Sequence, residues 1–346
     1  MQSPLIDILV PTYEPDPAFL KAAIESAIHQ TETRWQMFIH DDASTVDVKA
    51  IVEPYLKDER ITFERSDHRL GIGGNWNACL NMCHPEVLRR SHEGRHIMVR
   101  GSADAEHLTM TPSPYIQFLF QDDLWKPHYL EKILHALEKN PTAGFVSADH
   151  DYDCTKMKDS AAFYASIADE RHGISGGLHG GHVFLQTWIE SELHPNLIGE
   201  PSFVMLRRST VEKVGRFRED MPQFLDVEYW IRCLMATDLY HVTENLGTFR
   251  VHGGGASAQN QMTGVGIYDR LRCFEMLISK LPKSALKTAT IRARDRALTD
   301  MARKFLQRLG SKKSIPAKGT GGMTAFALKH PFLVLKSLFK ALRKSP

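Results

Sequence analysis

Short apolar runs alternate with segments of helical periodicity through the first part of the chain. The apolar runs cover residues 5–10, 35–40 and 61–64, and the helical segments cover residues 19–28 and 48–56. Apolar runs of this length predict buried strands, and a helix between successive strands is the usual connection of parallel strands. The sequence therefore predicts an α/β domain with a mainly parallel central sheet and flanking helices, whose active site lies beyond the carboxyl ends of the strands.

Further segments extend this pattern, with one long interruption. Residues 84–114 are predicted as a loop insertion, and residues 172–182, which are rich in glycine and histidine, as a mobile loop. The remaining predicted strands are 115–120, 145–147 and 201–206, and the remaining predicted helices are 75–82, 127–137, 209–214 and 227–236.

Two pairs of aspartates follow predicted strands. Asp41-Asp42 comes after the run at 35–40, and Asp122-Asp123 comes after the run at 115–120. Carboxylates gathered at one edge of a sheet suit Mg²⁺ or Mn²⁺, and such a cation usually completes its shell with phosphate oxygens and water. The pairs therefore favour a diphosphate substrate, while the alternative is that they cap helices or face solvent.

The net charge of +2 is the sum of two opposite regions. From Lys280 to the end there are 17 Lys and Arg against two acids, a charge of +15, and residues 1–279 carry −13. A basic terminal segment favours an anionic partner, either a nucleic acid or a membrane surface. No nucleic-acid-reading module is visible in the sequence, which favours the membrane.

The chain beyond about residue 261 has a helical pattern, which predicts a catalytic domain at 1–260 and a basic helical extension at 261–346. The segment 323–346 contains one apolar stripe with lysines beside it. Such a helix either packs on the catalytic domain or lies in an anionic membrane interface. The stripe consists of Leu328, Phe332, Leu335, Phe339 and Leu342.

The cysteine content and the N-terminal sequence indicate in which compartment the protein is located. The chain has five cysteines, an odd number, and begins without a basic, signal-like region. Free thiols in a cytoplasmic protein are therefore expected, with at most peripheral attachment to the inner face of a membrane. No run of eighteen apolar residues occurs, so no membrane-spanning helix is expected.

Residues 92–96 match the H-E-x-x-H pattern of zinc hydrolases. Two histidines on one helical turn can hold zinc beside a glutamate base, but the glycine within this segment and the basic residues before it do not form an amphipathic helix. A zinc-dependent hydrolase is therefore kept only as an alternative.

Ordered motifs across residues 5–255 resemble those of family 2 glycosyltransferases with the GT-A fold. The first four are VPTYEP at 10–15, HDDAS at 40–44, LGIGGNWN at 70–77 and FLFQDDLW at 118–125, and later ones lie at 199–202, 215–217, 225–232 and 249–252. The resemblance implies a transferase that uses a nucleoside diphosphate sugar. The final ninety residues lie outside it.

The resemblance also implies which residues hold the nucleotide. Pro11, Tyr13 and Asp42 would contact it, with Tyr13 near the base and Asp42 accepting from a uracil-type N–H. Glu14 and Asn75 belong to the same expected nucleotide site. The alternatives are a turn aromatic for Tyr13 and a helix cap for Asp42.

The second acidic motif implies a divalent metal, Mn²⁺ or Mg²⁺. Asp123 would be the direct ligand and Asp122 a partner of the ribose or of a metal-bound water, with His252 near the metal or the diphosphate. The family often has a further aspartate where this chain has Phe120. The lack of this aspartate affects the affinity that is expected for the metal. A purely structural role is the alternative for His252.

Asp226 resembles the general base of an inverting transfer, which takes the proton of the attacking acceptor hydroxyl. The alternatives are that Asp226 is only a helix N-cap and that Glu228 is the base. Glu200, Glu228 and Trp230 are the expected residues of the acceptor or sugar site. Substrate specificity is expected in residues 84–114 and 172–200.

These observations predict an inverting glycosyltransferase that moves a sugar, expected from a UDP-sugar, to a hydroxyl of a glycolipid or polysaccharide of the cell envelope. A non-catalytic nucleotide-sugar-binding protein of the same fold is the alternative. The intact Asp42, Asp123 and Asp226 favour the enzyme.

Overall fold

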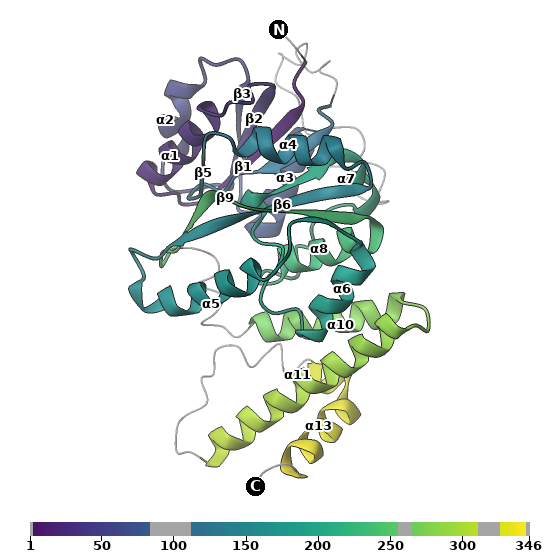
Figure 1. Cartoon of the computed structure of the whole chain (residues 1–346). Coiled ribbons are helices and arrows are strands. Elements are labelled where there is room, and N and C mark those ends of the chain that lie inside the picture. Colours follow the sequence, from purple (N-terminus) through teal and green to yellow (C-terminus); the bar gives the residue numbers. More distant parts are fainter. Residues whose placement is uncertain (1–2, 84–111, 255–264, 311–325, 344–346) are drawn as a thin grey trace, which may run out of the picture.

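A nine-stranded sheet with helices on both sides forms the centre of the protein (Figure 1). The computed structural model describes residues 3–83, 112–254, 265–310 and 326–343. Along the sheet the order is β3 (Ile61–Arg65), β2 (Trp35–Asp41), β1 (Ile6–Thr12), β4 (Tyr115–Phe118), β8 (Val204–Arg207), β6 (Ala143–Asp153), β9 (Asp238–Arg250) and β5 (Leu124–Trp125). A short strand, β7 (Gly177–His179), pairs with β9.

The N-terminal half of the sheet is parallel, as predicted. β1 pairs in parallel with β2 on one side and with β4 on the other, and β2 pairs in parallel with β3. β8 then runs antiparallel to both β4 and β6, while β6 and β9 are parallel. The α/β fold class with a mainly parallel sheet is therefore confirmed, with β8 as the central antiparallel strand.

Helices connect the strands and cover both faces of the sheet. The α1 helix begins after Asp16, whose Oδ1 accepts from the amides of Ala18 and Phe19 at 2.9 and 3.4 Å. The described residues up to 254 contain the helices α1 (Pro17–Ile28), α2 (Val48–Val52), α3 (Gly71–Met82), α4 (Tyr129–Lys139), α5 (Ala161–His172), α6 (Gly181–Glu190), α7 (Arg208–Val214) and α8 (Leu225–Ala236). Short 3-10 turns lie at η1 (Glu53–Tyr55), η4 (Lys158–Ser160) and η5 (Pro201–Phe203).

The two faces of the sheet belong to two hydrophobic clusters. Ile8 and Val10 of β1 pack in one cluster, whereas Leu9 packs in the other, because successive side chains of a strand point to opposite faces. All seven residues of β1 are buried. This burial explains why the strand has a continuous apolar run rather than an alternating pattern.

The C-terminal helices are α10 (Val265–Lys280), α11 (Ala285–Gly310) and α13 (Pro331–Arg343). Leu271, Phe274 and Leu277 of α10 are fully buried, in the same cluster as Trp230 of α8. The helical region beyond residue 260 thus shares its core with the sheet domain. Among the described helices, none combines the length and apolar character needed to cross a bilayer.

Several elements differ from the sequence prediction. The predicted strand at 201–206 begins as the turn η5, and the segment 172–182 contains β7 and the first two residues of α6. The long strand β9 and the helix α5 were not predicted. The helix expected at 75–82 begins earlier, at Gly71, whose φ of 81° a residue with a side chain rarely adopts.

Candidate active site

The carboxyl ends of β1, β2 and β4 lie side by side, which brings the two acidic motifs to one edge of the sheet. Just past the end of β1, the amide of Tyr13 donates to Gln121 Oε1 at 2.8 Å, and Gln121 Nε2 donates back to the Tyr13 carbonyl at 3.1 Å. The amide of Asp42 donates to the Thr12 carbonyl at 2.9 Å. β1 therefore links the Asp41-Asp42 motif to the Asp122-Asp123 motif.

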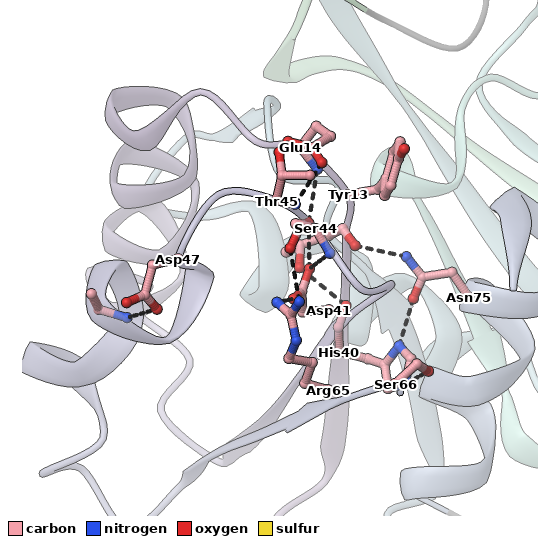
Figure 2. Close-up of polar contacts among 12 residues, drawn as sticks. Tyr13, Glu14, His40, Asp41, Ser44, Thr45, Asp47, Arg65, Ser66 and Asn75 are labelled. Atoms are coloured by element: carbon pink, nitrogen blue, oxygen red, sulfur yellow. Dashed lines mark hydrogen bonds and ion pairs between the residues drawn. The ribbon is translucent and has the colours of Figure 1, made fainter. Parts of the chain in front are cut away.

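Asp41 and Asp42 both bind the protein's own backbone or side chains. Asp41 is fully buried, accepts from the hydroxyl of Ser44 and forms an ion pair with Arg65 (Figure 2). Asp42 accepts from the amides of Leu70 and Gly71 at 2.6 and 3.0 Å. Asp42 thus binds the amides at the start of α3, whereas Asp47 caps α2, the helix that directly follows the motif.

Tyr13 and Glu14 lie in the turn after β1. The Arg69 guanidinium lies 4.0 Å from the centre of the half-buried Tyr13 ring. The exposed Glu14 carboxylate accepts from the amide and hydroxyl of Thr45 at 2.6 and 2.9 Å (Figure 2), and the Thr45 amide is the main cause of its lowered pKa. The turn therefore joins the ends of β1 and β2 and presents the Tyr13 ring beside a cation.

Asn75 and Pro11 support this turn from inside. Asn75 donates to the Thr12 carbonyl at 3.0 Å, and its Oδ1 lies 2.7 Å from Nδ1 of His40 (Figure 2). Pro11 is buried within β1. The structure thus gives both residues a contact or position inside the protein, next to the nucleotide site expected from the sequence.

Asp122 and His252 form a pair at the end of β4. His252 Nε2 lies 2.7 Å from Asp122 Oδ2, and the two side chains are 17% and 19% exposed. The edge of the His252 ring packs against Phe19, with ring centroids 5.6 Å apart. The sequence separation of these residues is large, so the fold brings together two side chains that can both bind a divalent cation.

Asp123 follows Asp122 in the chain and is more deeply buried than either member of this pair. Its side chain is fully buried, and its Oδ1 accepts from the Arg250 amide at 3.3 Å. Within the described part of the chain, Oδ2 has no hydrogen-bond partner. Burial raises the pKa of Asp123 well above its ordinary value, and the nearby Asp122 and Glu200 carboxylates raise it further. A buried carboxyl of this kind favours a positive charge close by.

Asp226 lies in the first turn of α8, but it does not cap the helix. The N-cap position belongs to Phe224, so the alternative that Asp226 is only an N-cap is wrong. Asn196 Nδ2 donates to Asp226 Oδ2 at 2.8 Å, and the Val227 amide donates to Oδ1 at 2.8 Å. Burial raises the pKa of Asp226 to about 7, and the Glu200 carboxylate adds to the rise.

Glu200 contributes to the electrostatics of both Asp123 and Asp226. The three carboxyl groups therefore share one electrostatic field, although they come from distant parts of the sequence. Glu200 Oε2 lies 2.8 Å from Nε2 of His150. Nε2 of His150 in turn lies 2.8 Å from Nη1 of the buried Arg171. The Arg171 guanidinium therefore places a positive charge next to His150, the partner of Glu200.

Glu228 and Trp230 are turned into the core. Glu228 is fully buried, and both of its oxygens accept from Arg232 at 2.8 to 3.0 Å. Trp230 is also fully buried, with its ring stacked 6.0 Å from Phe145 and its Nε1 donating to the Gly199 carbonyl at 3.0 Å. Trp230 thus links α8 to the 196–200 loop, whereas Glu228 pairs within α8.

Sequence reasoning missed Gln121, Asn196, His150 and Arg171. Gln121 precedes the second acidic pair and could have been considered from that position alone. Asn196 lies 30 residues from Asp226, and no motif connects the two. The positions of His150 and Arg171 depend on the long strand β6 and on α5, which were also incompletely predicted.

Two sequence predictions fall largely or wholly outside the described residues. The insertion predicted at 84–114 is described only from residue 112, and the H-E-x-x-H segment at 92–96 is not described. In the described ranges no group of three or more His, Cys, Asp or Glu side chains forms a ready cation site. All five cysteines lie in described ranges and are free.

The family comparison agrees with this site. The model of glycosyl transferase family 2 matches residues 7–89, which contain all of β1 but its first residue, and also β2, the first acidic pair and α3. An uncharacterized protein from Mycobacterium tuberculosis, MT1568, is 26% identical over 276 residues, which cover 80% of this chain and 76% of the relative.

Two further relatives have descriptive names. The O-antigen biosynthesis protein RfbC of Myxococcus xanthus is 23% identical over 76% of this chain, which spans only 17% of that protein. An uncharacterized glycosyltransferase of Methanocaldococcus jannaschii, MJ1057, is 23% identical over 68% of this chain and 66% of its own length.

Solved structures share the fold. Residues 1–349 of Staphylococcus aureus TarS in complex with UDP-GlcNAc match 99% of this chain and 81% of that one, with a TM-score of 0.57 and 12% identity. The mannosyltransferase PcManGT from Pyrobaculum calidifontis in complex with GDP-Man and Mn²⁺ matches 99% of this chain and 89% of that one, with a TM-score of 0.55 and 15% identity. The family match at residues 7–89, the glycosyltransferase relatives and the shared GT-A fold together support a glycosyltransferase that resembles family 2.

Proposed function

We propose that this enzyme transfers a sugar from a nucleoside diphosphate sugar to an acceptor hydroxyl in one displacement that inverts the anomeric centre. The observation that carries the proposal is Asp226, a partly buried carboxyl with a pKa of about 7 at the same site as the acidic end of the sheet. A general base works best when its pKa lies near the working pH.

Asp226 is the base in this mechanism. The acceptor oxygen attacks the anomeric carbon, its proton passes to Asp226, and the bond from that carbon to the diphosphate breaks, with the electron pair leaving on the diphosphate. Asn196 holds Asp226 Oδ2 at 2.8 Å and so orients the carboxylate. Glu228 is not the base, because Arg232 occupies both of its oxygens.

The donor nucleotide is placed at the carboxyl ends of β1 and β2. The half-buried Tyr13 ring, backed by Arg69, supplies a face on which a base can stack. Each carboxylate oxygen of Asp42 accepts one amide hydrogen bond at the start of α3 and has a further lone pair. Asp42 can therefore also accept from a uracil-type N–H. We propose a UDP-sugar as donor, with Pro11, Glu14 and Asn75 shaping the site. The UDP-GlcNAc complex of TarS supports this choice.

Asp122 and His252 are the residues that would hold a divalent cation, Mn²⁺ or Mg²⁺. Their side chains are 2.7 Å apart and both partly exposed, whereas Asp123 is fully buried. The buried Oδ2 of Asp123 has no hydrogen-bond partner among the described residues, and such an oxygen would fit a bound cation. Asp122 therefore takes the direct ligand role that the sequence had assigned to Asp123. When bound, the cation would stabilise the charge on the departing diphosphate.

The acceptor is proposed as a hydroxyl of a glycolipid or a growing polysaccharide of the cell envelope. The name of the relative RfbC supports this class. In this proposal Glu200 lies on the acceptor side of the site, because its carboxylate is close enough to Asp226 to raise the pKa of Asp226. Trp230 acts indirectly, through its hydrogen bond to the Gly199 carbonyl.

A transfer assay tests the proposal. The protein is incubated with a panel of UDP- and GDP-sugars, Mn²⁺ and envelope glycolipid extracts, and both sugar transfer and nucleoside diphosphate release are measured. We expect turnover with one donor, and a loss of about 100-fold or more in Asp226→Asn. Asp151→Asn is the matched control, because its side chain is 62% exposed on β6.

Two results would contradict the proposal. Unchanged turnover in Asp226→Asn removes Asp226 from the role of base. Tight binding of a donor with neither transfer nor hydrolysis for any sugar or acceptor supports the alternative of a non-catalytic nucleotide-sugar-binding protein.

A further inference from the structure

The C-terminal segment carries a row of large apolar side chains that the described residues leave exposed. They alternate at spacings of four and three along α13 and the helical residues 326–329 before it. This is much more exposed apolar surface than a short helix of a monomeric protein usually shows. The exposed fractions are 78% for Leu328, 84% for Phe332, 51% for Leu335, 64% for Phe339 and 57% for Leu342.

The opposite face of α13 packs against the protein, so the apolar row points outward. Ser337 and Ala341 are buried, and α13 packs alongside α11, as Figure 1 shows at the C-terminal end of the molecule. Lys336 and Lys340 also approach Asp295 of α11, with Nζ to Oδ2 distances of 3.6 and 3.9 Å. The helix is therefore docked by one side and presents the apolar row on the other.

Basic side chains line one edge of the apolar row. At about 100° per residue, the five apolar positions fall within roughly 80° of the helix circumference, and the basic positions lie beside them. No Asp or Glu occurs between residues 326 and 343. The basic residues are Lys329, Lys336, Lys340 and Arg343.

We propose that this apolar row and its basic edge bind the surface of an anionic lipid membrane. Apolar side chains can enter the acyl boundary while the lysines contact the headgroups, which is the arrangement of an interfacial helix. The charge of the whole chain fits this partner, because the region from Lys280 carries +15 and residues 1–279 carry −13. An anionic surface attracts the first region and repels the second.

A second copy of the chain is a poorer partner for the same face. Pairing two apolar rows would bring two basic edges of the same sign close together, because α13 itself has no acidic residue and the single Asp295 of α11 lies near only Lys336 and Lys340. The proposal concerns attachment alone and goes beyond sugar transfer, so each can fail without the other.

Vesicle flotation of the full chain tests the attachment. The vesicles contain phosphatidylcholine alone or phosphatidylcholine with 30% phosphatidylglycerol, in low and high salt. The double variant Phe332→Ser/Phe339→Ser removes apolar surface that is exposed in the structure, so its fold should be retained. Val183→Ser is the matched control, because Val183 is a 73% exposed apolar residue on α6.

We expect the unchanged chain and Val183→Ser to float with the anionic vesicles, less so at high salt. The double variant should bind at least tenfold more weakly and keep its turnover with a water-soluble acceptor. Failure of the unchanged chain to bind anionic vesicles, equal binding to neutral ones, or undiminished binding by the double variant would each overturn the proposal. So would a dimer that the double variant dissociates, without vesicle binding, since the face would then bind a second copy.

Discussion

Replacing Asp226 with asparagine should make the protein more stable while it slows transfer about 100-fold or more. Folding raises the pKa of this carboxyl from 3.8 to about 7. One pKa unit corresponds to about 1.4 kcal/mol of difference between the two protonation states, so ionised Asp226 costs the folded state on the order of 4 kcal/mol. Asparagine has nearly the same shape and carries no charge.

The sign of this effect depends on pH. Between pH 4 and 7 the unfolded chain releases the proton of Asp226, whereas the folded chain retains it. The unfolded state therefore gains stability relative to the folded state as the pH rises through this window, and the difference is complete above pH 7. The free energy of unfolding of Asp226→Asn should equal that of the unchanged chain near pH 4 and exceed it by up to ~4 kcal/mol at pH 8.

Urea unfolding at pH 5, 6, 7 and 8, followed by circular dichroism, measures this difference. Asp151→Asn serves as the control and should shift stability by no more than ~0.5 kcal/mol at any pH, because its side chain is largely exposed. A gain from Asp226→Asn that does not grow with pH, or a loss of stability above pH 6, would refute the account of Asp226 as a carboxyl destabilised by burial.

Three further perturbations probe the site and the core. Asn196→Ala removes a hydrogen bond that lowers the pKa of Asp226, so the acidic limb of the kcat/KM profile should move to higher pH; an unmoved limb contradicts the positioning role. His252→Ala should weaken donor binding, measured by calorimetry, much more with Mn²⁺ than without it, and an equal loss would remove His252 from the cation site. Asp7→Ala leaves the buried Arg208 without its ion-pair partner and should lower the free energy of unfolding by about 3–5 kcal/mol in urea titrations, whereas a change below ~1 kcal/mol would show that water compensates Arg208.

The parallel part of the fold could be predicted because its signals are local. Each strand of the β1 to β4 region is a short apolar run, and the segments between the first of them have the periodicity of a helix. Asp41 ends β2, and Asp122 lies four positions beyond the end of β4. Their meeting at one edge of the sheet therefore needed only the rule that parallel strands share a carboxyl end.

The second half was less predictable because its order depends on tertiary contacts. β9 mixes buried and exposed residues over 13 positions and pairs with three other strands, so its length reflects pairing rather than its own pattern. The structure of residues 172–182 likewise depends on β9, against which β7 is paired. A composition rich in glycine and histidine does not reveal such a partner.

The roles of single residues were the hardest to predict. Asp226 was assigned its role by resemblance, but its pKa depends on burial and on Glu200, neither of which the sequence displays. Asp122 is partly exposed beside His252, whereas Asp123 is fully buried. This difference arises only when β4 and the chain after β9 come together. Glu228 differs from Asp226 by two positions, yet the helix turns it towards Arg232.

The anomeric configuration of the product tests the central claim most directly. Once the donor is identified, proton NMR of the newly formed linkage shows whether the sugar has kept or inverted the configuration that it had in the donor. Direct attack by an acceptor whose proton passes to Asp226 predicts inversion in every product molecule. Retention would contradict this account, because a single displacement assisted by one carboxylate base cannot produce it.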